Sequence, residues 1–187
     1  MRIVGGRHRG RRIAPPVGRD VRPTSDRTRE SLFNILAHGG WGMGGASPLV
    51  DAVVLDAFCG TGALGLEALS RGAAQAVLLD RNRASLDLAR SNAGQLGEAA
   101  ACRFLLADAL KPPPAAAPAD ILFLDPPYGQ DLAPRALAAL AGAGWVRPGT
   151  LACVEVGDRD PFAPPAGFEP LDDRAYSHAR LLFLRAG

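Results

Sequence analysis

The side chains best suited to chemistry are an aspartate, two prolines and a tyrosine that follow one another in the chain. Asp125, Pro126, Pro127 and Tyr128 come directly after the apolar run 121–124, at the carboxyl end of a predicted strand, where open α/β sheets bind ligands. The prolines fix φ and lack an N–H, so this Asp-Pro-Pro-Tyr corner is expected to be stiff, with outward carbonyl acceptors. The alternative is structural: a strand that ends in a proline turn beside a core tyrosine.

The corner offers the acceptors that an exocyclic nucleobase amine needs. Such a nitrogen is a poor nucleophile because its lone pair is delocalised into the ring. Two N–H bonds donated to the Asp125 carboxylate and the Pro126 carbonyl would favour a pyramidal nitrogen and aim its lone pair at an electrophile. Asp125 could then accept the proton that the nitrogen loses, and the Tyr128 ring could stack on the base.

A second motif is the glycine loop, residues 56–65, which follows one predicted strand and opens a helix. It contains G-x-G-x-x-G at Gly60, Gly62 and Gly65. Glycines let the backbone approach a cofactor closely, and the helix behind the loop offers free N–H groups. Asp80 ends the next apolar run about twenty residues on, where a carboxylate can accept both ribose hydroxyls of an adenosine.

Asp56 distinguishes between two cofactor classes that suit such a loop, NAD and S-adenosylmethionine. A carboxylate at the mouth of the loop would repel a pyrophosphate but attract the cationic methionine end of S-adenosylmethionine. Asp56 could instead cap the turn. Asp108, just beyond the third predicted strand, is placed to accept the adenine amino group, or is an ordinary helix cap.

The charge is divided unevenly along the chain. Residues 1–29 carry nine arginines against two aspartates, a balance of +7, which leaves −5 for the rest of a chain whose net charge is +2. This division favours a basic arm over residues 1–22 that binds a polyanion and packs on a domain spanning 23–187; the alternative is a solvated tail. The RNA-binding candidates are Arg2, Arg7, Arg9, Arg11, Arg12, Arg22 and Arg27.

Other features of the sequence exclude several classes of protein. No run of eighteen apolar residues is present, and residues 1–20 lack the apolar stretch of a secretory signal, so we expect a cytoplasmic protein without a membrane span. The three cysteines and three histidines are scattered without ligand spacing, which predicts neither disulfides nor a metal. The sequence leaves the oligomeric state open, with a monomer as a possibility.

The elements that position these motifs alternate between strand and helix. We predict a small N-terminal hairpin over 1–13, a first helix over 25–38 and a linker over 39–48. From residue 50 on, short apolar runs near 53–55, 76–79, 104–106, 121–124, 150–156 and 181–184 alternate with helices at 62–71, after Asn82, and near 131–142. Continuous apolar strands flanked by helices indicate a parallel sheet covered on both faces.

Together, these residues resemble a class I S-adenosylmethionine-dependent methyltransferase of the Asn/Asp-Pro-Pro-Tyr type. The stretches Arg2-Ile3-Val4-Gly5-Gly6 and 22–33 (Arg-Pro-Thr-Ser-Asp-Arg-Thr-Arg-Glu-Ser-Leu-Phe) resemble the bacterial 16S ribosomal RNA guanine-N2 methyltransferase family. The resemblance extends to about Glu155. It implies a Rossmann-like, seven-stranded, mostly parallel sheet with an antiparallel last strand, helices on both faces, and an N-terminal hairpin and helix.

The resemblance also implies a reaction and its participants. The expected activity is methylation of the exocyclic N2 amine of a guanine in 16S ribosomal RNA of the small subunit, with Asp125 to Tyr128 around the target amine. The expected cofactor-binding residues are Asp56, Phe58, Gly60, Thr61, Gly62, Asp80, Arg81, Asp108 and Ala109. The family typically has Glu where Asp80 stands, which shortens the reach to the ribose by one methylene.

Two other functions remain open on the sequence alone. The same corner methylates adenine N6 or cytosine N4 in DNA enzymes, although these usually carry a separate target-recognition region. A non-catalytic RNA-binding assembly factor could also keep the methyltransferase fold, but the intact Asp-Pro-Pro-Tyr corner argues against it.

Overall fold

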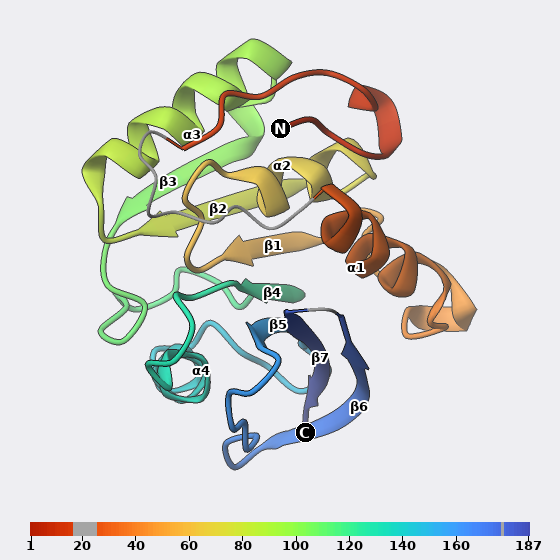
Figure 1. The fold of residues 1–187 in the computed structure, drawn as a ribbon, viewed down its shortest axis with the longest axis vertical. Coiled ribbons are helices and arrows are strands. Elements are labelled where there is room, and N and C mark those ends of the chain that lie inside the picture. Colours follow the sequence, from red (N-terminus) through yellow and green to blue (C-terminus); the bar gives the residue numbers. More distant parts are fainter. Residues whose placement is uncertain (17–25, 177) are drawn as a thin grey trace.

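A seven-stranded sheet organises the part of the chain that the structure describes (Figure 1). The computed structural model describes residues 1–16, 26–176 and 178–187. The strands are β1 (Val53–Asp56), β2 (Gln75–Asp80), β3 (Cys102–Leu106), β4 (Ile121–Leu124), β5 (Leu151–Gly157), β6 (Phe168–Ala175) and β7 (Ala179–Ala186). Their order in the sheet is β3-β2-β1-β4-β5-β7-β6. The first five strands are parallel and β7 runs antiparallel to both of its neighbours, which confirms the predicted fold.

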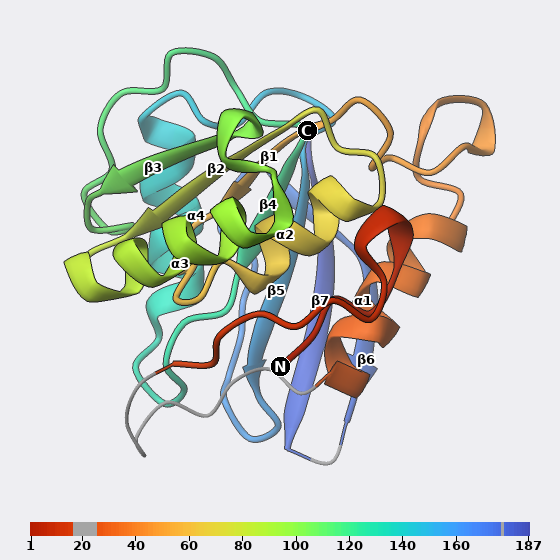
Figure 2. The same cartoon turned by 90° about the horizontal axis from the view of Figure 1, so that it is seen from above.

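In the described part of the chain, four α-helices cover the two faces of the sheet: α1 (Asp26–His38), α2 (Ala63–Ser70), α3 (Arg83–Leu96) and α4 (Leu132–Gly142). Helices α1, α2 and α3 pack with the N-terminal segment on one face, and α4 packs on the other (Figure 2). Short 3-10 turns lie at Gly6–His8, Met43–Gly45 and Ala99–Ala101. Two apolar clusters, one on each side of the sheet, therefore form the core.

The predicted helices agree with the structure because each has a local signal. Asn82 caps α3 as expected, since its Oδ1 accepts the N–H groups of Ala84 and Ser85 at 2.8 and 3.4 Å. The helix buries the apolar stripe that defined it, including Leu86, Ala89 and Ala93. The predicted N-terminal hairpin over 1–13 has one antiparallel bridge, between Arg2 and Arg12, and a 3-10 turn at Gly6–His8 between them.

The N-terminal segment (residues 1–16) lies across α2 and α3 (Figures 1 and 2). Ile3 and Ile13 are buried in the core on this face. The Glu67 carboxylate of α2 accepts the Val4 N–H at 2.8 Å, and the fully buried Arg29 of α1 donates to the Arg2 carbonyl at 2.6 Å. The basic segment is therefore held against the body by buried polar contacts as well as by apolar packing.

Candidate active site

Three aspartates gather at the carboxyl edge of the sheet. Asp56 ends β1, Asp80 ends β2 and Asp125 follows β4, and these three strands are adjacent and parallel. Burial is the main cause that raises the pKa of Asp56 to about 7. The charges of Asp125 and Asp80 add to this shift, and a hydrogen bond from the Gly65 N–H opposes it. The edge is thus a place where negative charge is concentrated and poorly solvated.

Asp56 has one satisfied oxygen and one that is not. Its Oδ2 accepts the Gly65 N–H at 3.0 Å, while its buried Oδ1 has no hydrogen-bond partner among the residues that the structure describes. Asp56 therefore does cap the turn, but with only one of its two carboxylate oxygens. An unpaired buried acceptor is costly, and a cationic ligand would remove that cost.

The glycine loop has the backbone shape that its sequence predicts. Gly60 and Gly62 have φ of +50° and +78°, a region that side chains disfavour. A Cβ on Gly65 would lie 2.4 Å from the Leu78 Cδ2, so α2 and β2 pack too closely there for a side chain. The loop therefore brings bare backbone to the edge of the sheet.

Asp80 supports this loop in the structure. Its Oδ2 accepts the Gly60 N–H at 2.9 Å and its Oδ1 accepts the Asn82 N–H at 2.8 Å. A carboxylate has about four acceptor sites, so these bonds leave capacity for the predicted ribose contact, which stays a prediction. Asp80, which is one methylene shorter than the glutamate typical of the family, thus bonds directly to the glycine loop.

The other predicted cofactor-binding residues lie around the same edge in different environments. Asp108 Oδ1 accepts the Leu110 N–H at 2.9 Å within a turn, and none of the helices in the described part of the chain begins there, so Asp108 is not a helix cap. Thr61 faces the N-terminal segment, since its hydroxyl contacts the Met1 sulfur at 3.5 Å and its carbonyl accepts from Asn92 at 3.0 Å. Ala109 is buried, Phe58 is half-buried and Arg81 is exposed.

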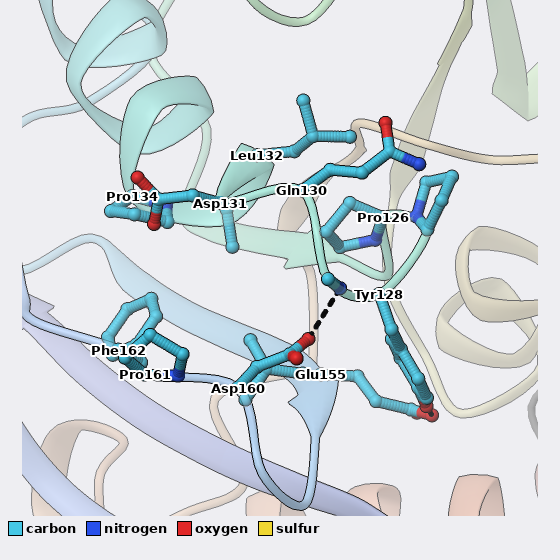
Figure 3. A pocket seen from close by; sticks show the side chains of 14 residues that line it. Pro126, Tyr128, Gln130, Asp131, Leu132, Pro134, Glu155, Asp160, Pro161 and Phe162 are labelled. Carbon is cyan, nitrogen blue, oxygen red and sulfur yellow. Dashed lines mark hydrogen bonds between the residues drawn. The ribbon is translucent and has the colours of Figure 1, made fainter.

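The Asp-Pro-Pro-Tyr corner is tied to the end of β5. Pro126 is buried, Pro127 is exposed, and Tyr128 is 40% exposed. The Tyr128 hydroxyl donates to Oε1 of Glu155, a β5 carboxylate with 5% exposure, and the two side chains point toward each other in Figure 3. Asp160 Oδ2 accepts the N–H of the residue after the corner, Gly129, at 2.8 Å.

A cavity of about 350 Å³ opens beside the corner. We call it the corner cavity. Its walls combine flat apolar groups with carboxylates: Pro126, Pro127, Tyr128, Gly129, Gln130, Asp131, Leu132, Ala133, Pro134, Glu155, Val156, Asp160, Pro161 and Phe162. Ring faces and hydrogen-bond acceptors together suit an unstacked nucleobase, which is read through both.

Several of the predicted RNA-binding arginines hold the N-terminal segment in place. Arg7 forms an ion pair with Glu98 at 2.7 Å, and Arg2 with Asp26 at 3.5 Å. Arg11 donates to the carbonyls of Gln95 and Leu96, where a cation complements the carboxyl end of α3. Arg9, Arg12 and Arg27 are exposed. Arg22 lies outside the described residues.

Sequence reasoning missed two groups of residues at this site. Glu155, Asp160 and Phe162 come from β5 and the segment after it, and they complete the corner cavity. Asn92, which is fully buried, bonds to both Ala14 and Thr61. A charged residue in the apolar run 151–156 was a visible signal for Glu155. Asn92 had no comparable signal, because its partners are distant in the sequence.

Two general features of the described residues bear on the class of protein. Over the described ranges, no helix combines the length and the apolar character needed to cross a membrane. In the same parts of the chain, no three His, Cys, Asp or Glu side chains are arranged so that they could hold one metal ion.

Comparison with known proteins identifies the family. The family model described as Conserved hypothetical protein 95 matches residues 1–185. The ribosomal RNA small subunit methyltransferase D of Escherichia coli (strain K12) is 39% identical over 156 residues, covering 83% of this chain and 74% of the relative. The protein of the same name from Haemophilus influenzae is 32% identical over 179 residues, covering 93% and 88%.

A solved structure gives the same result. The yhhF protein from Escherichia coli superposes with a TM-score of 0.83 at 34% identity, over 100% of this chain and 97% of that one. The family match spans nearly the whole chain. The relatives named as methyltransferases share more sequence with this chain than proteins that share only its fold. The chain therefore belongs to the Conserved hypothetical protein 95 family, the family of the ribosomal RNA small subunit methyltransferase D proteins, which confirms the predicted enzyme class.

Proposed function

We propose that this protein transfers a methyl group from S-adenosylmethionine to the exocyclic N2 amine of a guanine in 16S ribosomal RNA of the small ribosomal subunit, in the cytoplasm. One observation carries the proposal. A buried aspartate with an unpaired oxygen and two further carboxylates meet at the edge of the sheet where the Asp-Pro-Pro-Tyr corner begins. This edge of the sheet is suited to bind a cationic cofactor, and the adjacent corner is suited to accept hydrogen bonds from an amine.

The residues present fit S-adenosylmethionine better than a phosphate-bearing cofactor. Burial raises the pKa of Asp56 to about 7, and repulsion from Asp125 and Asp80 adds to the shift. A sulfonium and an ammonium group would relieve that repulsion, and a pyrophosphate would worsen it. Asp56 and the backbone at Gly60 and Gly62 would hold the methionine end, Asp80 the ribose and Asp108 the adenine. When bound, S-adenosylmethionine supplies an electrophilic methyl group.

The corner supplies the acceptors for the target amine. Asp125 and the Pro126 carbonyl would each accept one N–H of the amine, which localises the nitrogen lone pair and directs it along the line of attack. Asp125 holds the proton that leaves the nitrogen after transfer, or passes it to water. Because the corner follows β4 and Asp56 ends the adjacent β1, amine and cofactor are brought to one edge.

The corner cavity would receive the flipped base. Tyr128 offers a ring on which the base can stack, and Phe162 offers apolar surface from the opposite segment (Figure 3). Guanine presents an N1–H donor beside the target N2 amine, so an acceptor oxygen in the cavity wall is complementary to its Watson–Crick edge. The Asp160 carboxylate lies in that wall.

Ribosomal RNA would dock on the N-terminal segment and α1. Arg9, Arg12 and Arg27 are exposed there, and such side chains bind phosphates without reading sequence. Arg7 and Arg11 make contacts within the protein, so we assign them the role of holding the N-terminal segment in place, in addition to any RNA contact. The basic segment then acts as a fixed surface.

The direct test is methyl transfer with purified components. The protein is incubated with methyl-labelled S-adenosylmethionine and, separately, with small subunits from cells that lack it, free 16S ribosomal RNA and duplex DNA. Mass spectrometry of the nucleosides identifies the product. We expect N2-methylguanosine from an RNA substrate. N6-methyldeoxyadenosine or N4-methyldeoxycytidine from DNA would assign the chain to the DNA enzymes, and no transfer to any substrate would favour a non-catalytic assembly factor.

A further inference from the structure

A buried carboxylate sits in a strand that is otherwise apolar. Strand β5 reads Leu-Ala-Cys-Val-Glu-Val-Gly, and all seven residues are buried. Glu155 is 5% exposed and lies opposite Leu181 of β7. Burial of a carboxylate is expensive unless its oxygens are used, so a hydrophobic residue would be the default choice at this position.

This carboxylate accepts a hydrogen bond from the tyrosine of the corner. The Tyr128 hydroxyl donates to Glu155 Oε1 across 27 residues of chain. Strand β4 pairs with β5 up to Leu124 and Val154, so the corner, which follows Leu124, lies beside Glu155, which follows Val154. Tyr128 is 40% exposed, while its hydroxyl is held by the hydrogen bond to Glu155.

A tyrosine that follows two prolines has a fixed backbone approach but a side chain that can still rotate about χ1 and χ2. A hydrogen bond at the far end of the ring removes that freedom. Bonds to a charged acceptor are stronger than neutral ones, and this bond is shielded by the burial of Glu155. The ring is thereby set at one angle to the corner cavity.

We propose that Glu155 is a positioning residue for the methyltransferase reaction: it fixes the Tyr128 ring as the stacking platform for the target base. This inference rests on the function proposed above. Glu155 acts through Tyr128, and Asp125 remains the group that accepts the amine protons. Cofactor affinity, which depends on Asp56 and Asp80, is independent of Glu155.

A double-mutant cycle tests this coupling. Glu155→Ala and Tyr128→Phe should each lower kcat/KM for the RNA substrate about tenfold, the factor for one lost hydrogen bond of ordinary strength, with unchanged cofactor affinity. The double variant should be no worse than either single variant. Glu155→Gln keeps an acceptor oxygen and should restore most of the activity. Glu169→Gln on the exposed face of β6 is the matched control.

Two kinetic results would overturn the proposal. One is a full additional loss when Glu155→Ala is introduced into Tyr128→Phe, because Glu155 would then act without the hydroxyl. The other is Glu155→Gln as impaired as Glu155→Ala, because the requirement would then be for charge.

A spectroscopic measurement separates this inference from the proposed function. The chain has two tyrosines, so carbon NMR of Cζ-labelled tyrosine gives two signals, and Tyr128→Phe assigns the one from the corner. Glu155→Ala should move that signal and leave the Tyr176 signal in place, while Glu155→Gln moves it less. An unmoved signal contradicts the positioning role even in an active enzyme. A moved signal in a protein that transfers no methyl group would leave Glu155 as the ring anchor and reject the reaction alone.

Discussion

Replacing Asp56 by asparagine should abolish a specific pH dependence of cofactor binding. Asp56 is fully buried, its pKa is raised to about 7, and one of its oxygens lacks a partner among the described residues. A cationic ligand prefers the ionised carboxylate, so binding below pH 7 must first remove a proton. Affinity should therefore rise with pH up to 7 in the native protein and stay constant in Asp56→Asn.

The magnitude follows from the fraction of Asp56 that is ionised. With a pKa of about 7, that fraction is roughly one half at pH 7 and roughly 3% at pH 5.5, so the dissociation constant should change roughly fifteenfold over this range, or about 1.6 kcal/mol. The upper limit of pH 7 avoids the titration of an α-amino group, which begins above it.

The same shift makes a prediction about stability without cofactor. Between pH 4 and 7 the folded protein holds a proton on Asp56 that the unfolded chain, with a pKa of 3.8, has released. More protons are then bound in the folded state, so this group makes the free energy of unfolding fall as pH rises, by roughly 4 kcal/mol at most across the window. Asp56→Asn should lack this decline and be more stable than the native protein at pH 8.

Isothermal titration calorimetry in buffers of different ionisation enthalpy measures both the affinity and the protons released. The native protein should release close to one proton per cofactor at pH 6 and about half at pH 7, and Asp56→Asn none from this position. Asp87→Asn, on the exposed side of α3, is the control and should behave as the native protein. A dissociation constant that is flat between pH 5.5 and 7, or a slope that survives in Asp56→Asn, would refute the reasoning.

Three further predictions concern the corner, the N-terminal segment and the RNA surface. Asp125→Ala should lower kcat about a hundredfold or more with unchanged calorimetric affinity for S-adenosylmethionine; near-normal turnover contradicts the corner chemistry. Asn92→Ala should lower the urea-derived free energy of unfolding by about 2 to 4 kcal/mol and weaken cofactor binding, because it leaves polar groups of Ala14 and the glycine loop unpaired; unchanged cofactor affinity argues against this link. Arg9→Ala with Arg12→Ala should reduce the log–log salt slope of RNA binding by about 1.4, at about 0.7 per phosphate on single strands; an unchanged slope places the RNA elsewhere.

Local patterns were sufficient for the helices and for the buried strands. They failed at β6, whose sequence Phe-Glu-Pro-Leu-Asp-Asp-Arg-Ala has no apolar run. An edge strand pairs on one side and faces solvent on the other, so it needs few apolar residues and tolerates a proline. Its position is set by pairing with β7 and by contacts such as the ion pair of Asp173 with Arg180 at 2.6 Å, which local periodicity does not encode.

The same limit separates the predicted and missed parts of the site. The glycine loop and the corner are contiguous motifs, so Asp56, Asp80 and Asp125 could be placed at one edge from sequence alone. The role of the arginines could not, because Arg7 finds Glu98 across 91 residues and a local charge count treats every arginine as available to RNA. Glu155 was partly predictable. A charged residue is conspicuous in an apolar strand, but its contact with Tyr128 depends on the pairing of β4 with β5, which the local sequence does not show.

Mass spectrometry of 16S ribosomal RNA from cells that lack the protein tests the central claim most directly. We predict the loss of one methyl group from the N2 position of a single guanine. A copy of the native gene should restore that group, and a copy that carries Asp125→Ala should not. An unchanged pattern of methylation in the deletion strain, or a missing methyl group on an adenine or a cytosine, would contradict the assignment of this protein as a guanine-N2 methyltransferase.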